Sequence, residues 1–385
     1  MTTTFADLGV SDDLCSALSS RGITEPFAIQ SIAIPDALAG RDVCGKARTG
    51  SGKTLAFGIP VLENIGKAKP KRPLALALVP TRELAVQVSE ELIPLGKSRD
   101  VSVTAVYGGA NIERQIARLE KGVDFIVATP GRMIDLVDRK AVDLSDLTHV
   151  IVDEADRMAD MGFLPQVEWL LRQVDGEHQT LLFSATLDGV VDSLVRRYQT
   201  DPVFHEVESP QVTIDQMVHR FVQVHGMDKV KVAAAIADSV DRTIMFTATK
   251  HMADRLAREL KELGVNAAAI HGDLRQSHRE KALNDFAAGK LAVMVATDVA
   301  ARGIHVDDVE IVIHYDPPAE HKTYLHRSGR TARAGGEGLV VTLVLWNEEL
   351  DVKRMQKRVG LDLPIVEMFS NDSRLTDLAS WDPAA

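Results

Sequence analysis

Short apolar runs that end in polar residues or glycine alternate along the chain with segments of helical periodicity. The first half contains the runs PLALALVP, DFIVATP, THVIVDEAD and TLLFSAT, and the second half contains TIMFTAT, AVMVATD, VEIVIHYD and GLVVTLVLW. Between such runs, segments like RELAVQVSEELIPLG have the spacing of amphipathic helices. Buried parallel strands joined by crossover helices produce this pattern. We therefore predict an α/β fold with mostly parallel sheets flanked by helices.

The runs form two series, which predicts two domains in the 385 residues. The segment VESPQVTIDQM between the series is polar, contains one proline and has no strong period, as is typical of an interdomain linker. We place an N-terminal domain at 1–207, the linker at 208–217, a C-terminal domain at 218–369 and a short polar tail at 370–385. Two echoes between the halves, FSAT with FTAT and IVAT with MVAT, weakly favour a duplicated architecture.

Composition and charge narrow the class of protein. Hydrophobic residues make up 45% and charged residues 26% of the chain, which suits folded domains with large cores. The net charge of -11 excludes a chain-wide basic field, so any contact with nucleic acid has to be local. Only Cys15 and Cys44 occur, too few for a disulfide framework or a cysteine zinc site. With no signal-like start and no apolar run as long as a membrane span, we expect a cytoplasmic protein.

The segment ARTGSGKT, residues 47–54, follows a predicted strand and opens a predicted helix, as a phosphate-binding loop does. Glycines let successive backbone N–H groups face phosphate oxygens, while Lys53 reaches the β and γ phosphates and Thr54 ligates Mg²⁺. The alternative is a glycine-rich turn with a solvated lysine, which the strand and helix context disfavours. The residues that we expect to hold the nucleotide here are Arg48, Thr49, Gly50, Ser51, Gly52, Lys53 and Thr54.

A second candidate group follows the apolar run Val150-Ile151-Val152, where Asp153 and Glu154 end a predicted strand. A phosphate loop needs a carboxylate at another strand end to hold the metal ion, and Asp153 has that position. Its neighbour Glu154 is placed to orient and deprotonate the attacking water. An Asp–Glu pair that only caps a helix is the commoner explanation when the pair stands alone. The phosphate loop upstream favours the catalytic interpretation.

Together with that loop, the sequence Asp-Glu-Ala-Asp at 153–156 resembles the motif of the DEAD-box RNA helicases. Further segments match motifs of this family, in the family's order, across most of the chain. They are PTREL (80–84), the glycine pair 108–109, TPGR (129–132), SAT (184–186), HGDLRQSHR (271–279), ATDVAARG (296–303) and HRSGRTAR (326–333). Such a series in one order is far more specific than any single motif.

The resemblance implies two tandem recombinase-like domains of the P-loop NTPase type that close on ATP while gripping RNA across one face. It implies an ATP-dependent RNA helicase, that is, an RNA-stimulated ATPase that hydrolyses ATP to ADP and phosphate and uses Mg²⁺. The expected partner is RNA, single-stranded or in short duplexes, bound through its backbone without regard to sequence and unwound locally. The sequence names no protein partner and no physiological RNA.

The resemblance also implies roles for single residues beside the catalytic Lys53, Asp153 and Glu154. Gln30 resembles the glutamine that reads adenine, whose donor and acceptor edge suits a side-chain amide. Arg330 and Arg333 of the second domain would reach the transferring phosphate, where positive charge stabilises the transition state. Ser184 and Thr186 would couple hydrolysis to domain closure. The positions that match RNA contacts are Thr81, Arg82, Gly109, Thr129, Gly131 and Arg132 in the first domain and Arg279 and Thr297 in the second.

Several positions depart from the family's pattern. Ile23 stands where an aromatic ring usually stacks near the adenine, so we expect weaker base stacking. Phe27 replaces a threonine that helps to organise the phosphate loop, and it either packs locally or partly substitutes for the missing ring. After ARG, His305 stands where an acidic residue near the ribose is common, and Ala332 replaces a glycine in HRSGRTAR.

Two other functions stay open on the sequence alone. A non-enzymatic RNA clamp would bind ATP and RNA with little turnover, although Glu154, Arg330 and Arg333 argue against it. A DNA translocase or transport ATPase would use the same phosphate loop, although the DEAD, SAT and HRSGRTAR segments at these spacings make RNA the better match.

Overall fold

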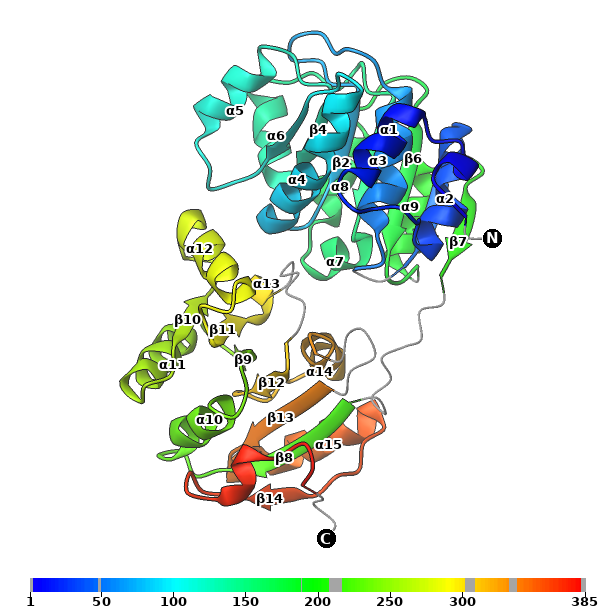
Figure 1. Cartoon of the computed structure of the whole chain (residues 1–385). Helices are drawn as coiled ribbons and strands as arrows, with labels where there is room; N and C mark the ends of the chain where they lie inside the picture. The colour runs from blue at the N-terminus through cyan, green and yellow to red at the C-terminus, as the bar shows by residue number, and fades with distance from the viewer. Residues whose placement is uncertain are drawn as a thin grey trace. The chain divides into compact units, whose positions relative to one another are not determined.

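The computed structural model describes residues 3–47, 50–187, 189–207, 217–301, 309–331 and 338–381. The chain divides into two compact units, an N-terminal unit of Met1–Ser209 and a C-terminal unit of Pro210–Ala385. Each unit is built on its own seven-stranded parallel sheet with helices on both faces (Figure 1). The predicted α/β fold class is confirmed. Strand β8 begins at Met217, a residue that we had expected to belong to the linker.

The sheet of the N-terminal unit has the strand order β3-β4-β2-β5-β6-β1-β7. All pairings between these strands are parallel; Val43 of β1, for example, pairs with Leu181 of β6 and Val203 of β7. The carboxyl ends of parallel strands meet at one edge of a sheet, so the loops that follow them are neighbours. The strands are β1 (Val43–Lys46), β2 (Ala75–Leu78), β3 (Val103–Val106), β4 (Phe125–Ala128), β5 (His149–Asp153), β6 (Gln179–Ser184) and β7 (Val203–Glu206).

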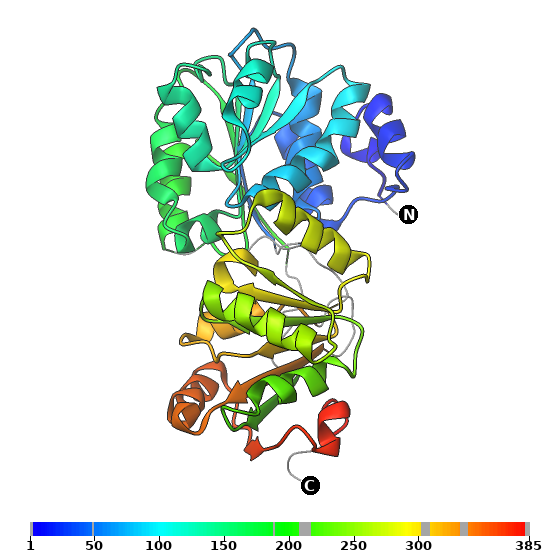
Figure 2. The same cartoon turned by 90° about the vertical axis from the view of Figure 1, so that its left-hand side faces the viewer.

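Both faces of this sheet are buried, which explains why its strands are nearly continuous apolar runs. On β2, Ala75 and Ala77 point into one core and Leu76 and Leu78 into the other, as the two-residue period of a strand requires. Helices on the two sides of the sheet are visible in Figure 2. The first core is closed by α1 (Asp12–Ser19), α2 (Ala28–Leu38), α3 (Lys53–Asn64) and α4 (Arg82–Ser98), and the second by α5 (Ile112–Leu119), α6 (Pro130–Asp138), α7 (Ala155–Asp160), α8 (Leu164–Leu171) and α9 (Val190–Tyr198).

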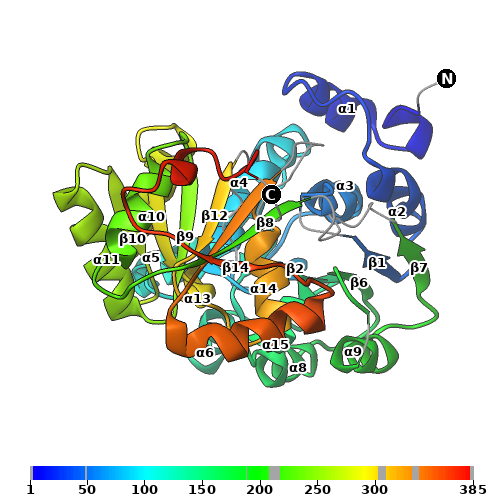
Figure 3. The same cartoon turned by 90° about the horizontal axis from the view of Figure 1, so that it is seen from below.

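The sheet of the C-terminal unit has the order β10-β11-β9-β12-β13-β8-β14, which repeats the order of the first sheet strand for strand. Its strands are β8 (Met217–Gln223), β9 (Thr243–Thr247), β10 (Ala267–Ile270), β11 (Val293–Thr297), β12 (Ile311–His314), β13 (Gly338–Val344) and β14 (Ile365–Glu367). Figure 3 shows helices on both of its faces. One face carries α10 (Lys229–Ala237) and α11 (Lys250–Glu262), and the other carries α12 (Gln276–Ala287), α13 (Asp298–Ala301), α14 (His321–Ser328) and α15 (Glu349–Val359).

The segment that we expected to be a short polar tail, 370–385, packs on this unit as far as it is described. Leu375 and Leu378 are buried in the core that α10 and α11 cover. Arg220 of β8 donates hydrogen bonds to the backbone oxygens of Leu378 and Trp381 and lies over the Trp381 ring. Three apolar residues spaced by three therefore hold the segment, although its overall composition is polar.

Within the described part of the chain, the helices are all too short or too polar to span a bilayer.

Candidate functional site

Three of the predicted motifs meet at the carboxyl ends of the adjacent strands β5, β6 and β1. Ser184, the last residue of β6, joins them and is fully buried. Its backbone oxygen accepts a hydrogen bond from the Ala47 N–H at 2.9 Å, where the phosphate loop leaves β1. Its hydroxyl accepts a hydrogen bond from the Asp156 N–H at 3.1 Å, inside the DEAD sequence. The SAT, DEAD and phosphate-loop segments thus form one connected site.

A buried charge pair lies at the centre of this site. Lys53 is the first residue of α3, and its Nζ lies 3.7 Å from Oδ1 of Asp153, the last residue of β5. Both side chains are buried, and within the described residues the Lys53 ammonium has no hydrogen-bond acceptor. Burial raises the pKa of Asp153 to about 6, although the Lys53 charge opposes the shift. Buried charges with unused hydrogen-bonding capacity indicate a binding site for a charged ligand.

The backbone of the phosphate loop needs its glycines. Gly50 and Gly52 have φ values of 84° and 83°, in the left-handed region that other residues avoid. A Cβ atom on Gly52 would lie 2.3 Å from Nε2 of Gln30 and 2.6 Å from Cδ2 of Phe27. Ser51 is half-buried in the same loop. Arg48 and Thr49, which we expected to bind the nucleotide here, lie outside the described residues.

Gln30 is buried against the phosphate loop, in the first turn of α2. Its Oε1 accepts a hydrogen bond from the Phe27 N–H at 2.8 Å, and its Nε2 donates one to the Gly52 oxygen at 2.9 Å. Both ends of the amide are therefore used within the protein. Phe27 is 58% exposed beside the loop, whereas Ile23 is half-buried and packs against the core.

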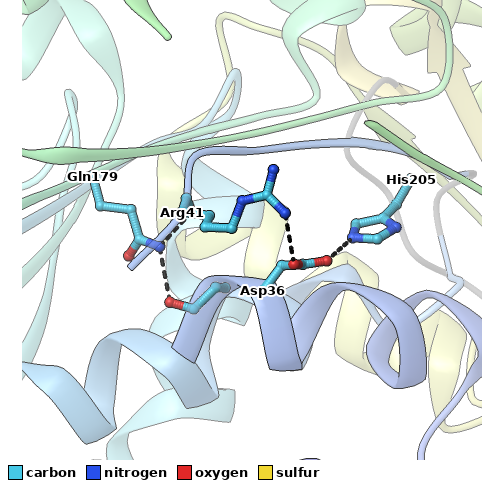
Figure 4. A network of polar contacts seen from close by, with 5 residues as sticks. Asp36, Arg41, Gln179 and His205 are labelled. Carbon is cyan, nitrogen blue, oxygen red and sulfur yellow. Dashed lines mark hydrogen bonds and ion pairs between the residues drawn. The ribbon is translucent and has the colours of Figure 1, made fainter. Parts of the chain in front are cut away.

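The helix that carries Gln30 is fixed to the sheet at its other end, as Figure 4 shows. Asp36 of α2 lies 2.8 Å from Nε2 of His205 on β7 and accepts a hydrogen bond from Arg41 at 3.3 Å. Gln179 of β6 donates hydrogen bonds to the backbone oxygens of Ala37 and Arg41, at 2.8 and 2.6 Å. These contacts hold α2, and with it Gln30, in one position relative to the strand ends.

Glu154 has an unusual backbone and an internal ion pair. Its φ of 52° is in the left-handed region, which costs energy for a residue with a side chain. Its N–H donates a hydrogen bond to Oδ1 of Asp153 at 2.9 Å. Its carboxylate accepts one from Arg157 at 2.7 Å, and both side chains of this pair are largely buried.

Two further predicted residues lie at the edges of this site. Burial raises the pKa of Glu91 on α4 above its ordinary value, and the Thr54 hydroxyl beside it opposes the shift. The Thr54 side chain therefore faces a carboxyl group of the protein in this structure. Thr186 is exposed, two residues beyond the end of β6.

A second group of predicted residues gathers at the ends of β2, β3 and β4, the other half of the same edge. Thr81 follows β2 and caps α4, accepting a hydrogen bond from the Leu84 N–H at 3.2 Å. The Arg82 guanidinium lies so close to Gly109, whose φ is 85°, that a Cβ atom there would be 2.3 Å from Nη1. Thr129 follows β4 as the N-cap of α6, and Gly131 lies in the first turn of that helix.

Arg132 joins this group through a residue that the sequence did not single out. Its Nη1 donates hydrogen bonds to the Ala110 oxygen at 3.2 Å and to Oε1 of Gln115 at 3.1 Å. Gln115 is buried on α5 and donates its own hydrogen bond to the Tyr107 oxygen at 3.1 Å. Burial lowers the pKa of Arg132; the carboxylate of Asp135, 3.9 Å away, opposes the shift, and the charge of Arg82 adds to it. Two guanidinium groups held near each other favour an anionic ligand.

In the C-terminal unit, the predicted residues lie near the ends of β10 and β11. Arg279 is buried on α12, and Thr297 is the last residue of β11. Arg330 follows α14, and its N–H donates a hydrogen bond to the Arg327 oxygen at 3.2 Å. Arg333, His305 and Ala332 lie outside the described residues.

Arg327 is a second residue that the motif comparison did not assign. It is buried and donates hydrogen bonds to both carboxylate oxygens of Asp298, at 2.6 and 2.9 Å, and to the Asp316 oxygen at 2.7 Å. Its guanidinium carbon lies 5.1 Å from the centre of the Phe246 ring. The signal was present in the sequence, because Asp298 belongs to ATDVAARG and Arg327 to HRSGRTAR. These bonds tie α14 to α13 and to the strand ends beside it.

The N-terminal unit has the features of a P-loop nucleotide-binding protein. Its parallel sheet has helices on both faces, a glycine-rich loop follows β1, a lysine begins the next helix, and an aspartate ends β5. The family model for DEAD/DEAH box helicases matches residues 27–194, and the model for the helicase conserved C-terminal domain matches 225–335. The chain belongs to the DEAD-box helicase family.

Similar proteins and solved structures belong to the same family. The DEAD-box ATP-dependent RNA helicase CshA of Bacillus subtilis (strain 168) is 40% identical over 359 residues, which are 93% of this chain and 72% of that protein. CshA of Bacillus licheniformis is 41% identical over 351 residues, 91% of this chain and 72% of that protein. Among solved structures, S. cerevisiae Dbp5 bound to RNA and ADP BeF3 is similar with a TM-score of 0.80 and 28% identity, covering 97% of this chain and 98% of that one.

Proposed function

We propose that the protein is an ATP-dependent RNA helicase, whose two units close on ATP and RNA and separate short duplexes locally. The observation that carries the proposal is the site joined by Ser184, where the phosphate loop and the DEAD sequence meet around a buried lysine that has no hydrogen-bond acceptor among the described residues. A nucleoside triphosphate supplies the acceptors that this lysine lacks. The named relatives are RNA helicases, and the Dbp5 structure contains RNA and a nucleotide.

Within this site, Lys53 would bind the β and γ phosphates, and the loop from Arg48 to Gly52 would surround them with backbone N–H groups. Gln30 would read the adenine, for which its amide has to exchange the Phe27 and Gly52 backbone partners for the base. The exposed Phe27 ring lies close to the same glycine and is available to cover part of the nucleotide.

The donor set fits a magnesium ion. Asp153 is a buried carboxylate that, among the described residues, lies beside the Lys53 ammonium and accepts a hydrogen bond from the Glu154 N–H. The Thr54 hydroxyl lies one residue beyond Lys53. Mg²⁺ usually takes one or two protein oxygens and fills its remaining positions with phosphates and water. When bound, the ion would neutralise phosphate charge. Asp153 would hold it, partly through water, and Thr54 would have to exchange Glu91 for it.

Glu154 is the proposed general base, and its contacts suggest how it is controlled. In this structure its carboxylate is paired with Arg157, at 2.7 Å. Hydrolysis therefore requires Glu154 to turn from Arg157 towards the water. Arg330 and Arg333 would contribute positive charge from the C-terminal unit, and Ser184 and Thr186 would transmit closure to the site.

RNA would bind along the ends of β2, β3 and β4. Thr81, Arg82, Gly109, Thr129, Gly131 and Arg132 offer hydroxyls, backbone N–H groups and guanidinium groups, the chemistry of phosphate and sugar recognition without base readout. Arg279 and Thr297 would extend the contact on the C-terminal unit. We further propose that the two units are the helicase domains, the first at 1–207 and the second from Met217, where β8 begins, through the packed segment after 370, with a linker between them. We also propose a cytoplasmic location.

The test is ATP hydrolysis measured alone, with single-stranded RNA and with single-stranded DNA of the same length, together with strand separation of a short RNA duplex. RNA should stimulate hydrolysis more than DNA, and Lys53→Ala should remove both activities. Lys97→Ala, which changes an exposed lysine, is the matched control. Binding of ATP and RNA with little turnover in the presence of RNA would favour a non-enzymatic clamp, and equal stimulation by DNA would favour a DNA translocase.

A further inference from the structure

Gln115 lies at the junction of two segments that the proposed function assigns to RNA. One is the glycine turn, residues 107–110, which follows β3 and contains Gly109. The other is the first turn of α6, which contains Arg132. Gln115 itself belongs to neither, because it lies on α5 with only 6% of its surface exposed. It has no sequence motif of its own, and its side chain faces inward.

The hydrogen bonds of Gln115 are arranged in a definite direction. Oε1 accepts from Nη1 of Arg132 at 3.1 Å, and Nε2 donates to the Tyr107 oxygen at 3.1 Å. An arginine only donates and a carbonyl only accepts, so only one of the two orientations of the Gln115 amide satisfies both partners. The same Arg132 nitrogen also donates to the Ala110 oxygen at 3.2 Å. The amide therefore connects the arginine to one end of the glycine turn while the arginine itself contacts the other end.

This arrangement also affects Arg82. The Arg82 guanidinium packs directly over Gly109, in the middle of the turn that Gln115 and Arg132 fix at its two ends. A shift of the turn would move both guanidinium groups relative to each other. Because phosphates along an RNA strand have a fixed spacing, the positions of these two cations decide how well they bind the backbone together.

We propose that Gln115 is a positioning residue for RNA binding, which locks Arg132 and the glycine turn into one preformed phosphate cradle. The inference rests on the proposed function, since it assumes that Arg132 contacts RNA. Gln115 does not touch the RNA. It removes the need to order Arg132 and the turn when RNA arrives, and so it increases affinity without adding a contact.

The main test replaces the amide by an unbranched apolar side chain of similar length, Gln115→Met. RNA affinity in the presence of a non-hydrolysable ATP analogue should fall about tenfold, the effect of losing a buried, charge-assisted hydrogen bond. In ATPase assays the RNA concentration at half-maximal stimulation should rise by a similar factor. The rate at saturating RNA, the RNA-free rate and the affinity for ATP should stay near wild type, because the nucleotide site lies at other strand ends.

A second variant, Gln115→Glu, keeps the shape of the side chain if the methionine variant folds poorly. The carboxylate still accepts from Arg132, but it neutralises the guanidinium charge and repels the Tyr107 oxygen. RNA affinity should again fall, and the slope of log affinity against log salt should decrease by about one counterion. Wild-type RNA affinity and an unchanged slope in this variant, or lower protein stability with wild-type RNA affinity in Gln115→Met, would overturn the proposal.

A double-mutant cycle separates the inference from the proposed function. If Gln115 acts mainly through Arg132, Gln115→Met should weaken RNA binding less in the Arg132→Ala background than in wild type, because only its hold on the glycine turn is left to lose. Additive losses would contradict the inference, as would wild-type affinity in both Gln115 variants when Arg132→Ala binds weakly. If Arg132→Ala has no effect on RNA affinity, the assignment of the RNA surface is wrong. Gln173→Met is the matched control, because this glutamine on the same unit is exposed and, within the described residues, donates a local hydrogen bond to the Trp169 oxygen.

Discussion

At the scale of single residues, Lys53 and Asp153 show how a binding site differs from a stabilising ion pair. A buried pair contributes to stability only when its geometry is good and its other hydrogen bonds are satisfied. Here the atoms are 3.7 Å apart, and the ammonium lacks an acceptor among the described residues. The raised pKa of Asp153 reflects the cost of burying its charge. The pair is therefore arranged for a ligand rather than for the folded state alone.

The first prediction concerns Glu154, the proposed base. Glu154→Gln keeps the shape of the side chain and a hydrogen bond to Asp153 through the backbone, but it cannot accept a proton. ATP binding should persist, and the rate of hydrolysis should fall by roughly 10²-fold or more. Single-turnover hydrolysis with saturating RNA measures the chemical step. Glu90→Gln, on the exposed side of α4, should hydrolyse ATP like wild type. Wild-type turnover in Glu154→Gln would assign the base to another residue.

The second prediction concerns acid stability through His149, the first residue of β5. Burial lowers the pKa of His149 to about 4, below the value of about 6.5 expected in the unfolded chain. Between these values the unfolded state binds a proton that the folded state refuses, so stability falls as the pH decreases from about 6.5 to about 4. The loss is on the order of 3 kcal/mol.

Hydrogen exchange of the β5 amides at a series of pH values tests this linkage. His149→Gln should show a flatter decline in acid than wild type, while His251→Gln, at an exposed position, should follow wild type. Identical pH curves for wild type and His149→Gln would show that His149 is protonated in the folded unit.

At the scale of residues, the motifs could be predicted from the sequence, but the hydrogen-bond and ion-pair partners of their residues could not. Phosphate-loop and DEAD chemistry follow from residue type and spacing. The ion pair of Glu154 with Arg157 and the hydrogen bonds of Gln30 to the phosphate loop depend on backbone geometry that spacing does not encode. Gln115 was missed for the same reason, because a buried glutamine on a polar helix has no signal in one sequence.

At the scale of elements, the strand order of the N-terminal sheet separates the nucleotide residues from the proposed RNA-binding residues. Strands β5, β6 and β1 are neighbours and end at the nucleotide residues, while β3, β4 and β2 are neighbours and end at the proposed RNA residues. The β2–β5 pairing, in which Leu78 lies opposite Val152, is the boundary between them. A parallel sheet thus places both sites on one rigid edge, with strand order deciding which motifs are close.

The apolar runs predicted this fold class, because strands buried on both faces have a strong signal. The two short sequence similarities between the halves were only partly informative about duplication. IVAT and MVAT end β4 and β11, which occupy equivalent positions in the two sheets, whereas FSAT and FTAT end β6 and β9, which do not. The second echo is a shared strand ending rather than a trace of duplication. The packed segment after 370 was hidden by its polar composition.

The third prediction tests that segment. Leu375 is buried in the C-terminal unit, so Leu375→Ala should lower the free energy of unfolding of that unit by about 2–5 kcal/mol. Leu350→Ala, at a leucine that is 71% exposed, should change it by less than about 0.5 kcal/mol. Urea denaturation, monitored by hydrogen exchange of the amides in β8 and β13, measures the change in unfolding free energy. Equal stabilities of the two variants would mean that the segment contributes nothing to the core.

At the scale of the whole molecule, the proposed catalytic residues are divided between two units of the same topology. Lys53, Asp153 and Glu154 belong to the N-terminal unit, and Arg330 belongs to the C-terminal unit. Neither unit holds the complete set. If RNA and ATP both favour the same closed state, each ligand must increase the affinity for the other by the same factor.

The last prediction follows from this linkage. Arg330→Ala should leave ATP binding to the N-terminal unit largely intact and remove most of the hydrolysis that RNA stimulates, because its contact forms with transition-state charge. Arg358→Ala, on α15, provides a control for the loss of one arginine from the same unit.

The decisive measurements are the ATPase rate against RNA concentration and RNA affinity with and without an ATP analogue. In wild type the analogue should tighten RNA binding as much as RNA tightens analogue binding. A chain of residues 1–207 that hydrolyses ATP at the RNA-stimulated rate of the whole protein would contradict the two-unit mechanism, because such a chain has no arginine from the second unit.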